Sequence, residues 1–264
     1  MKKKNILITG ANRGLGLYLS EMFMNEGHNL FLLSRSNKAK NKIKKINSNE
    51  QKIIFSNLDL NKKNEIIKIK NLIKKKFKDI DIVINNAATQ GPIGLFHKNN
   101  FNLWEKTIYT NLINTAYLIK ILIPFLKKNK PSCVINISGG GSSNSRKFFS
   151  SYSVAKTGIV RLTENLAEEY KKYGIKFYAI APGVLNTKMY NDSIQKEKKL
   201  HKIKRQVFFS DMNDTFELIK FLSNNNVKTS GKIISAIWDK WKSKKFLKLL
   251  NSNKDFLTLR RIIK

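Results

Sequence analysis

Seven short runs of almost uninterrupted apolar residues limit what this chain can fold into. They lie at 4–10, 29–35, 52–60, 81–88, 132–138, 175–183 and 232–237, and stretches with helical periodicity separate them, the longest at 101–128 and 152–172. Strands that lack polar alternation are buried on both faces, as in parallel sheets. The alternation of strand and helix predicts an α/β fold with a doubly wound, seven-stranded parallel sheet flanked by helices.

The chain is predicted to form a single domain. Its 264 residues are 41% hydrophobic, and no linker-like or repeated segment interrupts the predicted domain at residues 1–240. The longest apolar stretch, 117–126, is too short to span a bilayer, so no membrane span is expected. The basic start and short apolar run of "MKKKNILITGANRG" fit a first strand better than a leader peptide. The single cysteine, Cys133, fits a reducing, cytoplasmic environment.

The formal charge of +33 raises the question of an anionic partner. Only seven of the 51 basic residues are arginine, and the lysines are scattered rather than collected on one helix face. Proteins that read phosphate usually enrich arginine, and single-strand binders interleave aromatics with basic runs. The pattern therefore favours a general lysine-rich composition over nucleic-acid binding.

A glycine-rich loop follows the first predicted strand and opens the first predicted helix. In "TGANRGLG", Gly10 permits a tight turn, Gly14 allows close approach of a phosphate, and Gly16 lets the helix pack against the sheet. The free N–H groups of the helix start would face a pyrophosphate. This predicts a Rossmann-type dinucleotide site, which also includes Asn12 and Leu15 of the loop.

The end of the second strand predicts which dinucleotide binds. NAD sites usually place a carboxylate there, and it would repel the 2′-phosphate of NADP. This chain has Ser34 followed by Arg35, and Arg13 lies in the glycine loop. A hydroxyl and two cations favour NADP(H) over NAD(H), although Arg35 could instead be a solvated residue at the strand end.

Tyr152 and Lys156 form a candidate proton-transfer pair. Four residues apart on a helix, they share one face. A free tyrosine has a pKa of about 10, and a nearby ammonium would stabilise its phenolate. Tyr152 could then give a proton to a carbonyl oxygen or take one from an alcohol. Taken alone, the spacing also fits a surface pair.

In this order and spacing, T-G-x-x-x-G-x-G, N-N-A-A, Y-x-x-x-K and P-G resemble the short-chain dehydrogenase/reductase family, over residues 4 to about 240. The segments "SGGGSSNSRKFFSSYSVAKTGIVRLTENLAEE" and "GKIISAIWDKW" more weakly resemble a bacterial branch associated with surface-polysaccharide synthesis.

The resemblance implies further site residues. Asp59, with its neighbour Leu60, would bond the adenine, and Asn86 and Ala87 would line its ribose; Ala88 stands where glycine is more frequent. Lys156 would also hold the nicotinamide ribose, and Asn111 would bond a water that links Lys156 to solvent. Around the nicotinamide carboxamide, the implied residues are Pro182, Gly183, Val184 and Thr187.

The family's substrate-polarising serine usually sits thirteen residues before the tyrosine, and here that position is Gly139. Three alternatives follow. Ser138 serves after a local bulge, a loop serine (Ser142 or Ser143) substitutes, or the N–H groups of residues 139–141 contact the oxyanion themselves. We favour Ser138 among them.

The resemblance also implies a mobile substrate lid at about 186–212 and a homodimer or homotetramer built on the two long helices. The basic, amphipathic tail at 241–264 would cover a neighbouring subunit or lie on the surface. None of the three histidines has metal-ligand spacing, so no metal is expected.

Two functions fit this sequence best. The first is an NADP(H)-dependent oxidoreductase that interconverts a carbonyl and an alcohol on a small polar substrate such as a sugar or sugar nucleotide. The alternative is a dinucleotide-binding sensor or scaffold with little turnover, which the glycine at position 139 supports.

Overall fold

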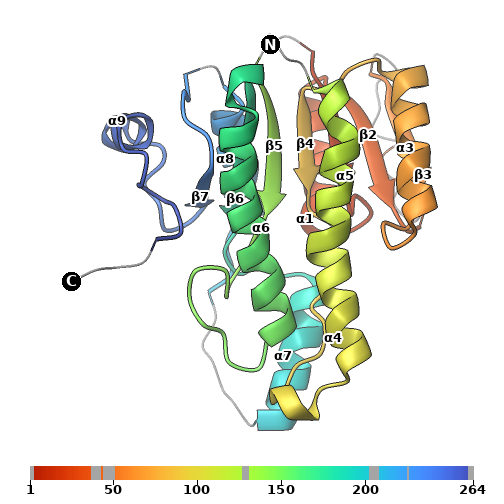
Figure 1. Ribbon diagram of the computed structural model, residues 1–264, viewed down its shortest axis with the longest axis vertical. Coiled ribbons are helices and arrows are strands. Elements are labelled where there is room, and N and C mark those ends of the chain that lie inside the picture. The colour runs from red at the N-terminus through yellow and green to blue at the C-terminus, as the bar shows by residue number, and fades with distance from the viewer. Residues whose placement is uncertain are drawn as a thin grey trace.

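The computed structural model describes residues 3–36, 43, 51–126, 131–201, 208–224 and 226–260. One parallel sheet forms its centre, with strand order β3-β2-β1-β4-β5-β6-β7. Figure 1 shows the strands side by side, with their carboxyl ends toward the protruding helices α4 and α7. The predicted doubly wound, seven-stranded fold is confirmed. The strands are β1 (Asn5–Thr9), β2 (Asn29–Ser34), β3 (Ile53–Asn57), β4 (Ile82–Asn85), β5 (Ser132–Ile137), β6 (Ile175–Ala181) and β7 (Lys232–Ser235).

Helices cover both faces of the sheet. The helices longer than one turn are α1 (Gly14–Asn25), α3 (Lys63–Lys76), α4 (Phe101–Ile108), α5 (Asn114–Leu122), α6 (Ser150–Glu169), α7 (Lys188–His201), α8 (Met212–Leu222) and α9 (Lys244–Ser252). Short 3-10 turns lie at Phe96–Lys98, Ile123–Phe125 and Lys171–Tyr173.

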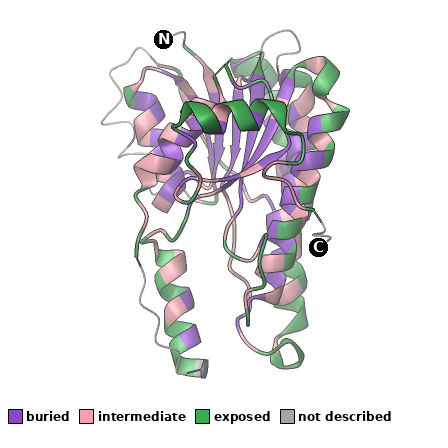
Figure 2. Cartoon of the chain, turned by 90° about the vertical axis from the view of Figure 1, so that its left-hand side faces the viewer, coloured by how far each residue is buried: buried purple, intermediate pink, exposed green. Residues whose placement is uncertain are grey.

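The pleat of the strands divides the core in two. On β1, Ile6 and Ile8 join a cluster with α1 and α8, whereas Leu7 joins a second cluster with α3 and α5. Figure 2 shows the mostly buried sheet between partly exposed helices, and only its edge strand β3 has no buried residue. A sheet buried on both faces explains why its strands carry continuous apolar runs.

The long helical segment predicted at 101–128 is not one regular helix. A π-helical turn, η2 (Tyr109–Ile113), interrupts it between α4 and α5, and residues 127–130 lie outside the described part. By length and composition Phe101–Phe125 could cross a membrane. However, Leu118, Ile119 and Leu122 are buried against the sheet, as in the core helix of an α/β protein.

The described part of the tail folds back on its own chain. Phe246 and Leu250 of α9 are buried in the core cluster that contains α1 and α8. The ammonium of Lys232, which is 1% exposed, donates to the carbonyls of Asn253, Lys254 and Phe256 at 3.0, 2.7 and 2.8 Å. Lys232 thereby supplies donors to a chain segment that follows the end of α9.

We expect Lys232→Met to lower the free energy of unfolding by about 2–3 kcal/mol, because three carbonyls lose their charged donor. Urea titration would measure the change. Lys228→Met, at an exposed lysine just before β7, is the matched control and should change stability by less than about 0.5 kcal/mol. Equal effects of the two substitutions would contradict this role of Lys232.

Candidate active site

A large cleft lies at the carboxyl ends of the strands, with a volume of about 2070 Å³. This is where doubly wound sheets bind ligands, because the strand order reverses on either side of β1. Gly16 and Asn111 are the only predicted site residues outside its lining. The others all line it: Gly10, Asn12, Arg13, Gly14, Leu15, Ser34, Arg35, Asp59, Leu60, Asn86, Ala87, Ser138, Tyr152, Lys156, Pro182, Gly183, Val184 and Thr187.

The glycine loop brings backbone close to backbone at the start of α1. Gly10 and Gly14 have φ angles of +69° and +52°, in the region that favours glycine. A Cβ on Gly16 would lie 2.3 Å from the carbonyl oxygen of Gly10. The side chain of Arg13 does not cap the helix, so the N–H groups of its first turn face the cleft as an anion-binding end.

Thr9 and Asn86 join the ends of β1 and β4. The Thr9 hydroxyl accepts hydrogen bonds from the backbone N–H groups of Asn86 and Ala87, at 3.0 and 2.9 Å. The Asn86 amide donates to the carbonyl of Thr9 at 3.0 Å. These bonds hold residues 86 and 87 against the glycine loop, on the side where the adenosine ribose is expected.

The end of β2 offers cations and no carboxylate. Ser34 is buried, and its hydroxyl donates to the Ser36 carbonyl, whereas Arg35 and Arg13 are exposed at the cleft. Asn12 donates to the Ser36 hydroxyl at 2.8 Å, which ties the glycine loop to the end of β2. At the end of β3, the Asp59 carboxylate accepts from the N–H and side-chain amide of Asn61, at 3.0 and 2.9 Å.

Tyr152 and Lys156 lie on the first turns of α6 and face the cleft. The Lys156 ammonium is 3% exposed, donates to the carbonyl of Ile137 at 2.6 Å, and lies 5.6 Å from the Tyr152 ring centroid. Burial lowers the pKa of Lys156 to about 8. In the protein alone, burial raises the pKa of Tyr152, and the positive charge of Arg146 opposes this. The expected lowering of this pKa by Lys156 is not seen: burial and Arg146 are the groups that shift it.

Asn111 lies in the π-helical turn and is buried. Its side-chain oxygen accepts from the N–H of Thr89 and its amide donates to the Thr89 carbonyl, both at 2.8 Å. Asn111 therefore fixes the chain that follows β4 rather than lining the cleft. The predicted water link to Lys156 stays a prediction.

Position 139 lies next to the hydroxyl of Tyr152. A Cβ on Gly139 would lie 2.8 Å from the Tyr152 hydroxyl oxygen. Ser138 is 2% exposed, and its hydroxyl has no hydrogen-bond partner in the described part of the chain. Ser142 is also buried, and its backbone N–H donates to the Gly139 carbonyl at 3.2 Å. The roles of these serines stay predictions.

The chain after β6 closes the cleft on its far side. Gly183 has a φ of +81°, and a Cβ there would lie 2.1 Å from the Ser210 hydroxyl. The Val184 carbonyl accepts from the N–H of Ser210 at 2.8 Å. Thr187 lies against the glycine loop, since its Cγ2 would be 3.3 Å from a Cβ on Gly14. Of the predicted lid, α7 and residues 208–210 line the cleft, and residues 202–207 lie outside the described part.

The sequence reasoning missed two parts of the cleft wall. Arg146 lines it beside the glycines that follow β5, and together with Lys147 it supplies the only cations between Gly139 and Tyr152. Two basic residues alone in a loop of glycine, serine, asparagine and aromatic residues were a usable sign of a charged group at the cleft. Leu257, Thr258 and Leu259 also line the cleft, and the N–H of Ile233 donates to the Leu257 carbonyl at 2.9 Å. No motif marks these tail residues.

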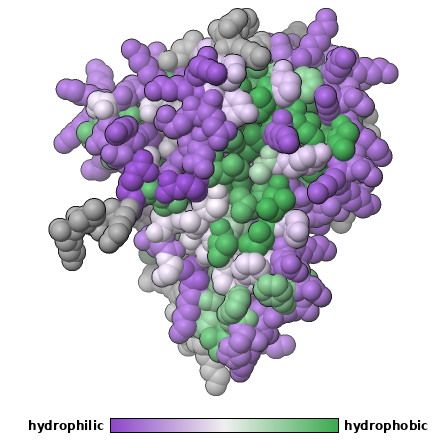
Figure 3. Space-filling view, in the orientation of Figure 1, coloured by the Kyte–Doolittle hydropathy of each residue, from purple (hydrophilic) through white to green (hydrophobic). Residues whose placement is uncertain are grey.

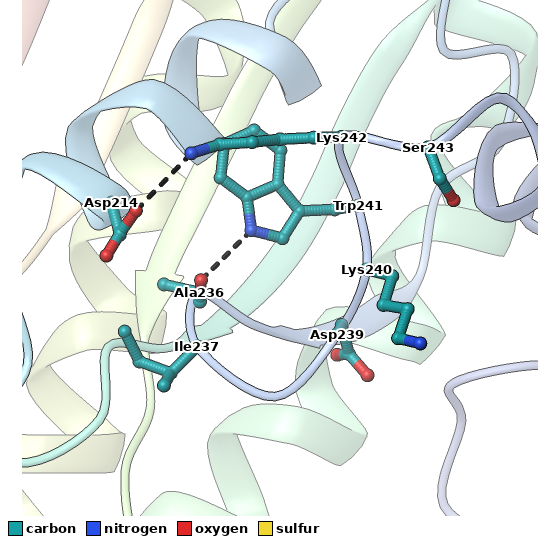
Figure 4. A pocket seen from close by; sticks show the side chains of 8 residues that line it. All are labelled: Asp214, Ala236, Ile237, Asp239, Lys240, Trp241, Lys242 and Ser243. Atoms are coloured by element: carbon teal, nitrogen blue, oxygen red, sulfur yellow. Dashed lines mark hydrogen bonds and ion pairs between the residues drawn. The ribbon is translucent and has the colours of Figure 1, made fainter.

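A second hollow of about 440 Å³ lies on the loop after β7 (Figure 4). The Trp241 indole N–H donates to the Ala236 carbonyl at 3.0 Å, and Lys242 pairs with Asp214 at 3.5 Å. Ile237 and Asp239 line both this hollow and the cleft. These contacts brace the loop that forms one wall of the cleft. Within the described residues, no three His, Cys, Asp or Glu side chains gather as a metal site requires.

Comparison with known proteins identifies the family of this chain. The family profile described as short chain dehydrogenase matches residues 4–198. The 3-oxoacyl-[acyl-carrier-protein] reductase FabG of Buchnera aphidicola subsp. Baizongia pistaciae is 34% identical over 208 residues, covering 76% of this chain and 82% of the relative. Glucose 1-dehydrogenase 2 of Bacillus subtilis is 27% identical, covering 76% and 80%.

Among solved structures, ElxO with NADP bound has a TM-score of 0.76 at 27% identity, covering 89% of this chain and 97% of ElxO. An actinorhodin polyketide ketoreductase with NADPH has a TM-score of 0.80 at 19% identity, which shows a shared fold. The chain belongs to the short-chain dehydrogenase/reductase family of oxidoreductases. These comparisons do not bear out the narrower resemblance to a surface-polysaccharide branch.

Lys156 should make stability depend on pH in a specific direction. Its pKa is about 8 in the folded chain and 10.5 ordinarily. Below pH 8 both states carry the proton, and burial of the charge costs the folded state about 3 kcal/mol. As pH rises from 8 to 10.5 the folded state loses its proton first, so this cost disappears.

The stability advantage of Lys156→Met over the unsubstituted protein should therefore shrink by roughly 2 kcal/mol between pH 7 and pH 10. Urea unfolding at a series of pH values measures this difference. Lys171→Met, at an exposed lysine, is the control for the many other titrating groups and should show no such trend. A difference that stays constant or grows with pH would show that Lys156 is not buried as a cation.

Proposed function

We propose that this protein is an NADP(H)-dependent oxidoreductase that interconverts a carbonyl and an alcohol, with Tyr152 as the acid/base. The observation that carries the proposal is the placement of Tyr152 and Lys156 in one cleft with a glycine-rich helix start and the cations at the end of β2. Family membership supports the reaction class.

The residues of the cleft fit a nicotinamide dinucleotide. The glycines at positions 10 and 16 allow close packing of the loop against Asn86, Ala87 and the Gly10 carbonyl, and the uncapped start of α1 would then bind a pyrophosphate. Arg13 and Arg35 would bind a 2′-phosphate beside the Ser34 position, and Asp59 and Leu60 would border the adenine. The remaining cofactor contacts would come from Asn86, Ala87, Pro182, Gly183, Val184 and Thr187. The bound nicotinamide would supply or accept the hydride.

Tyr152 would move the proton. Its raised pKa keeps the hydroxyl protonated at neutral pH, which suits a proton donor to a carbonyl oxygen. Lys156, held by the Ile137 carbonyl, would orient toward the nicotinamide ribose with two further N–H donors. Asn111 would position the loop after β4 through Thr89 and hold a water near Lys156.

Ser138 is our candidate for the hydroxyl that polarises the substrate oxygen. It is buried at the cleft wall, and its hydroxyl lacks a partner among the described residues, which is uncommon for a buried polar group. The sensor or scaffold function is the second candidate. It is supported by Gly139, which has no side chain at the position that lies next to the Tyr152 hydroxyl.

The substrate is proposed to be a small polar carbonyl or alcohol such as a sugar or sugar nucleotide, consistent with the named activity of the glucose dehydrogenase relative. A place in surface-polysaccharide synthesis remains part of this proposal. The protein would act in the cytoplasm, with no role in nucleic-acid binding.

A homodimer or homotetramer would form on α4, α5 and α6. Tyr109 and Ile113, in the π-helical turn between α4 and α5, are 53% and 42% exposed, and Val154 on α6 is 50% exposed. Figure 3 shows an apolar strip down this face with polar side chains on both sides. Covering such a strip would remove apolar area from water.

Arg35→Ala should weaken NADPH binding by about ten- to a hundred-fold, since it removes one charged contact to the 2′-phosphate. Binding of NADH should change by less than about two-fold. Fluorescence titration with both nucleotides measures this, and Lys74→Ala on exposed α3 is the matched control. Equal affinities for NADPH and NADH in the unsubstituted protein would overturn the NADP(H) preference.

Tyr152→Phe should lower the turnover of small aldehydes, ketones and sugars by about a hundred- to ten-thousand-fold, with unchanged NADPH binding. Ser138→Ala should lower it by about a hundred- to a thousand-fold if its hydroxyl polarises the substrate. Loss of NADPH absorbance measures turnover, and Tyr170→Phe, at the end of α6, is the control. Turnover that survives Tyr152→Phe would refute the acid/base role, and turnover that survives Ser138→Ala would leave that role to the loop.

A further inference from the structure

The loop between β5 and α6 holds a cation beside the reacting position. Arg146 lines the cleft, and its guanidinium carbon lies 3.6 Å from the centroid of the Phe149 ring. Phe149 is 0% exposed and is the residue that precedes the first turn of α6. A guanidinium held over a fixed ring is restricted in position, and its planar fork carries five N–H donors.

The loop around Arg146 is fixed at several points. Thr157 of α6 donates to the carbonyls of Gly141 and Ser142, at 3.4 and 3.1 Å. The Phe148 carbonyl accepts from the N–H of Gly94 at 3.0 Å, and Phe148 has a φ of +71°. Arg146 is therefore held on an ordered support rather than on a freely moving surface loop.

Two glycines open the space between this cation and the acid/base tyrosine. A Cβ on Gly139 would lie 2.8 Å from the Tyr152 hydroxyl, and a Cβ on Gly140 would lie 4.0 Å from Nη1 of Arg146. With no side chain at either position, a substrate substituent can occupy the floor between both groups. The charge of Arg146 reaches Tyr152, since it opposes the rise in the pKa of that hydroxyl.

We propose that Arg146 is a substrate-binding residue that holds an anionic group, a carboxylate or a phosphate, close to the reacting carbon over Gly139 and Gly140. This rests on the proposed oxidoreductase function and narrows its substrate class to carbonyl compounds or alcohols with an acidic group near the reacting carbon. Arginine suits this role because its planar fork bonds carboxylate and phosphate through two parallel N–H groups.

The first test measures binding without turnover. Inorganic phosphate and malonate are titrated calorimetrically into the NADPH-loaded protein and into the protein without nucleotide. At least one anion should bind the unsubstituted protein at least ten-fold more tightly than Arg146→Gln, and which anion binds distinguishes phosphate from carboxylate recognition. Lys147→Gln removes the same charge from an exposed neighbour outside the cleft lining and should change the affinity by less than two-fold.

Arg146→Lys tests the fork itself and also serves if Arg146→Gln proves unstable in thermal unfolding. It should restore less than half of the lost affinity. Failure of NADPH to bind while anions still require Arg146 would defeat the proposed function alone. Three outcomes would overturn the Arg146 site. The anion affinity could be the same in Arg146→Gln as in the unsubstituted protein, Lys147→Gln could lose as much affinity as Arg146→Gln, or the anions could bind only adventitiously.

The second test compares matched carbonyl compounds. With NADPH present, Arg146→Gln should raise the KM for dihydroxyacetone phosphate or pyruvate at least ten-fold, while the KM for neutral dihydroxyacetone or acetone changes by less than two-fold. A uniform fall in kcat for charged and neutral compounds would show that Arg146 acts only on loop structure and would overturn the specificity role.

Discussion

The junction between the ends of β1 and β4 supports the rest of the site. There the Thr9 hydroxyl receives two backbone N–H groups from the chain after β4, and Asn86 returns a hydrogen bond to the Thr9 carbonyl. Gly16 has no room for a Cβ against Gly10. Because β1 lies where the strand order reverses, this close contact sets how far the cleft opens and where the start of α1 is directed.

The fold was largely predictable because its physical cause is written in the sequence at short range. Strands buried on both faces need continuous apolar runs, and β1, β2, β5 and β6 each carry one. The glycine loop was equally legible, since a positive φ at Gly10 and Gly14 requires a specific residue type. Element boundaries were less so: the π-helical turn at Tyr109–Ile113 leaves no trace in the apolar periodicity.

The parts of the site that escaped prediction depend on long-range packing. Leu257, Thr258 and Leu259 reach the cleft because Lys232 and Glu164 hold the tail, and no local pattern encodes that return. The pKa of Tyr152 was expected to fall, because a lysine lies four residues away on the same helix. Burial instead raises the pKa of Tyr152, and the degree of burial cannot be read from spacing.

The lysine-rich composition also has a structural use that charge counting hides. Lys4, Lys156, Lys176 and Lys232 each donate to main-chain carbonyls, three of which belong to residues 223, 227 and 137. A long side chain with a compact ammonium can reach a carbonyl that a strand or helix end leaves unpaired. These four lysines thus bind main-chain carbonyls within the fold, and their charges imply no external anionic partner.

The substitution at position 139 and the cation at position 146 have one physical explanation. A Cβ at position 139 would lie 2.8 Å from the Tyr152 hydroxyl, so any side chain there would occupy the floor beside Tyr152. Glycine at 139 and 140 frees that floor, and Arg146, stacked on a fully buried ring, supplies a charge that acts over a longer range than a hydroxyl. A cation beside this open floor favours substrates that carry an anionic group, while Ser138 stays the candidate for the hydroxyl that polarises the substrate oxygen. The loop that departs from the family pattern is therefore where substrate selectivity should be sought.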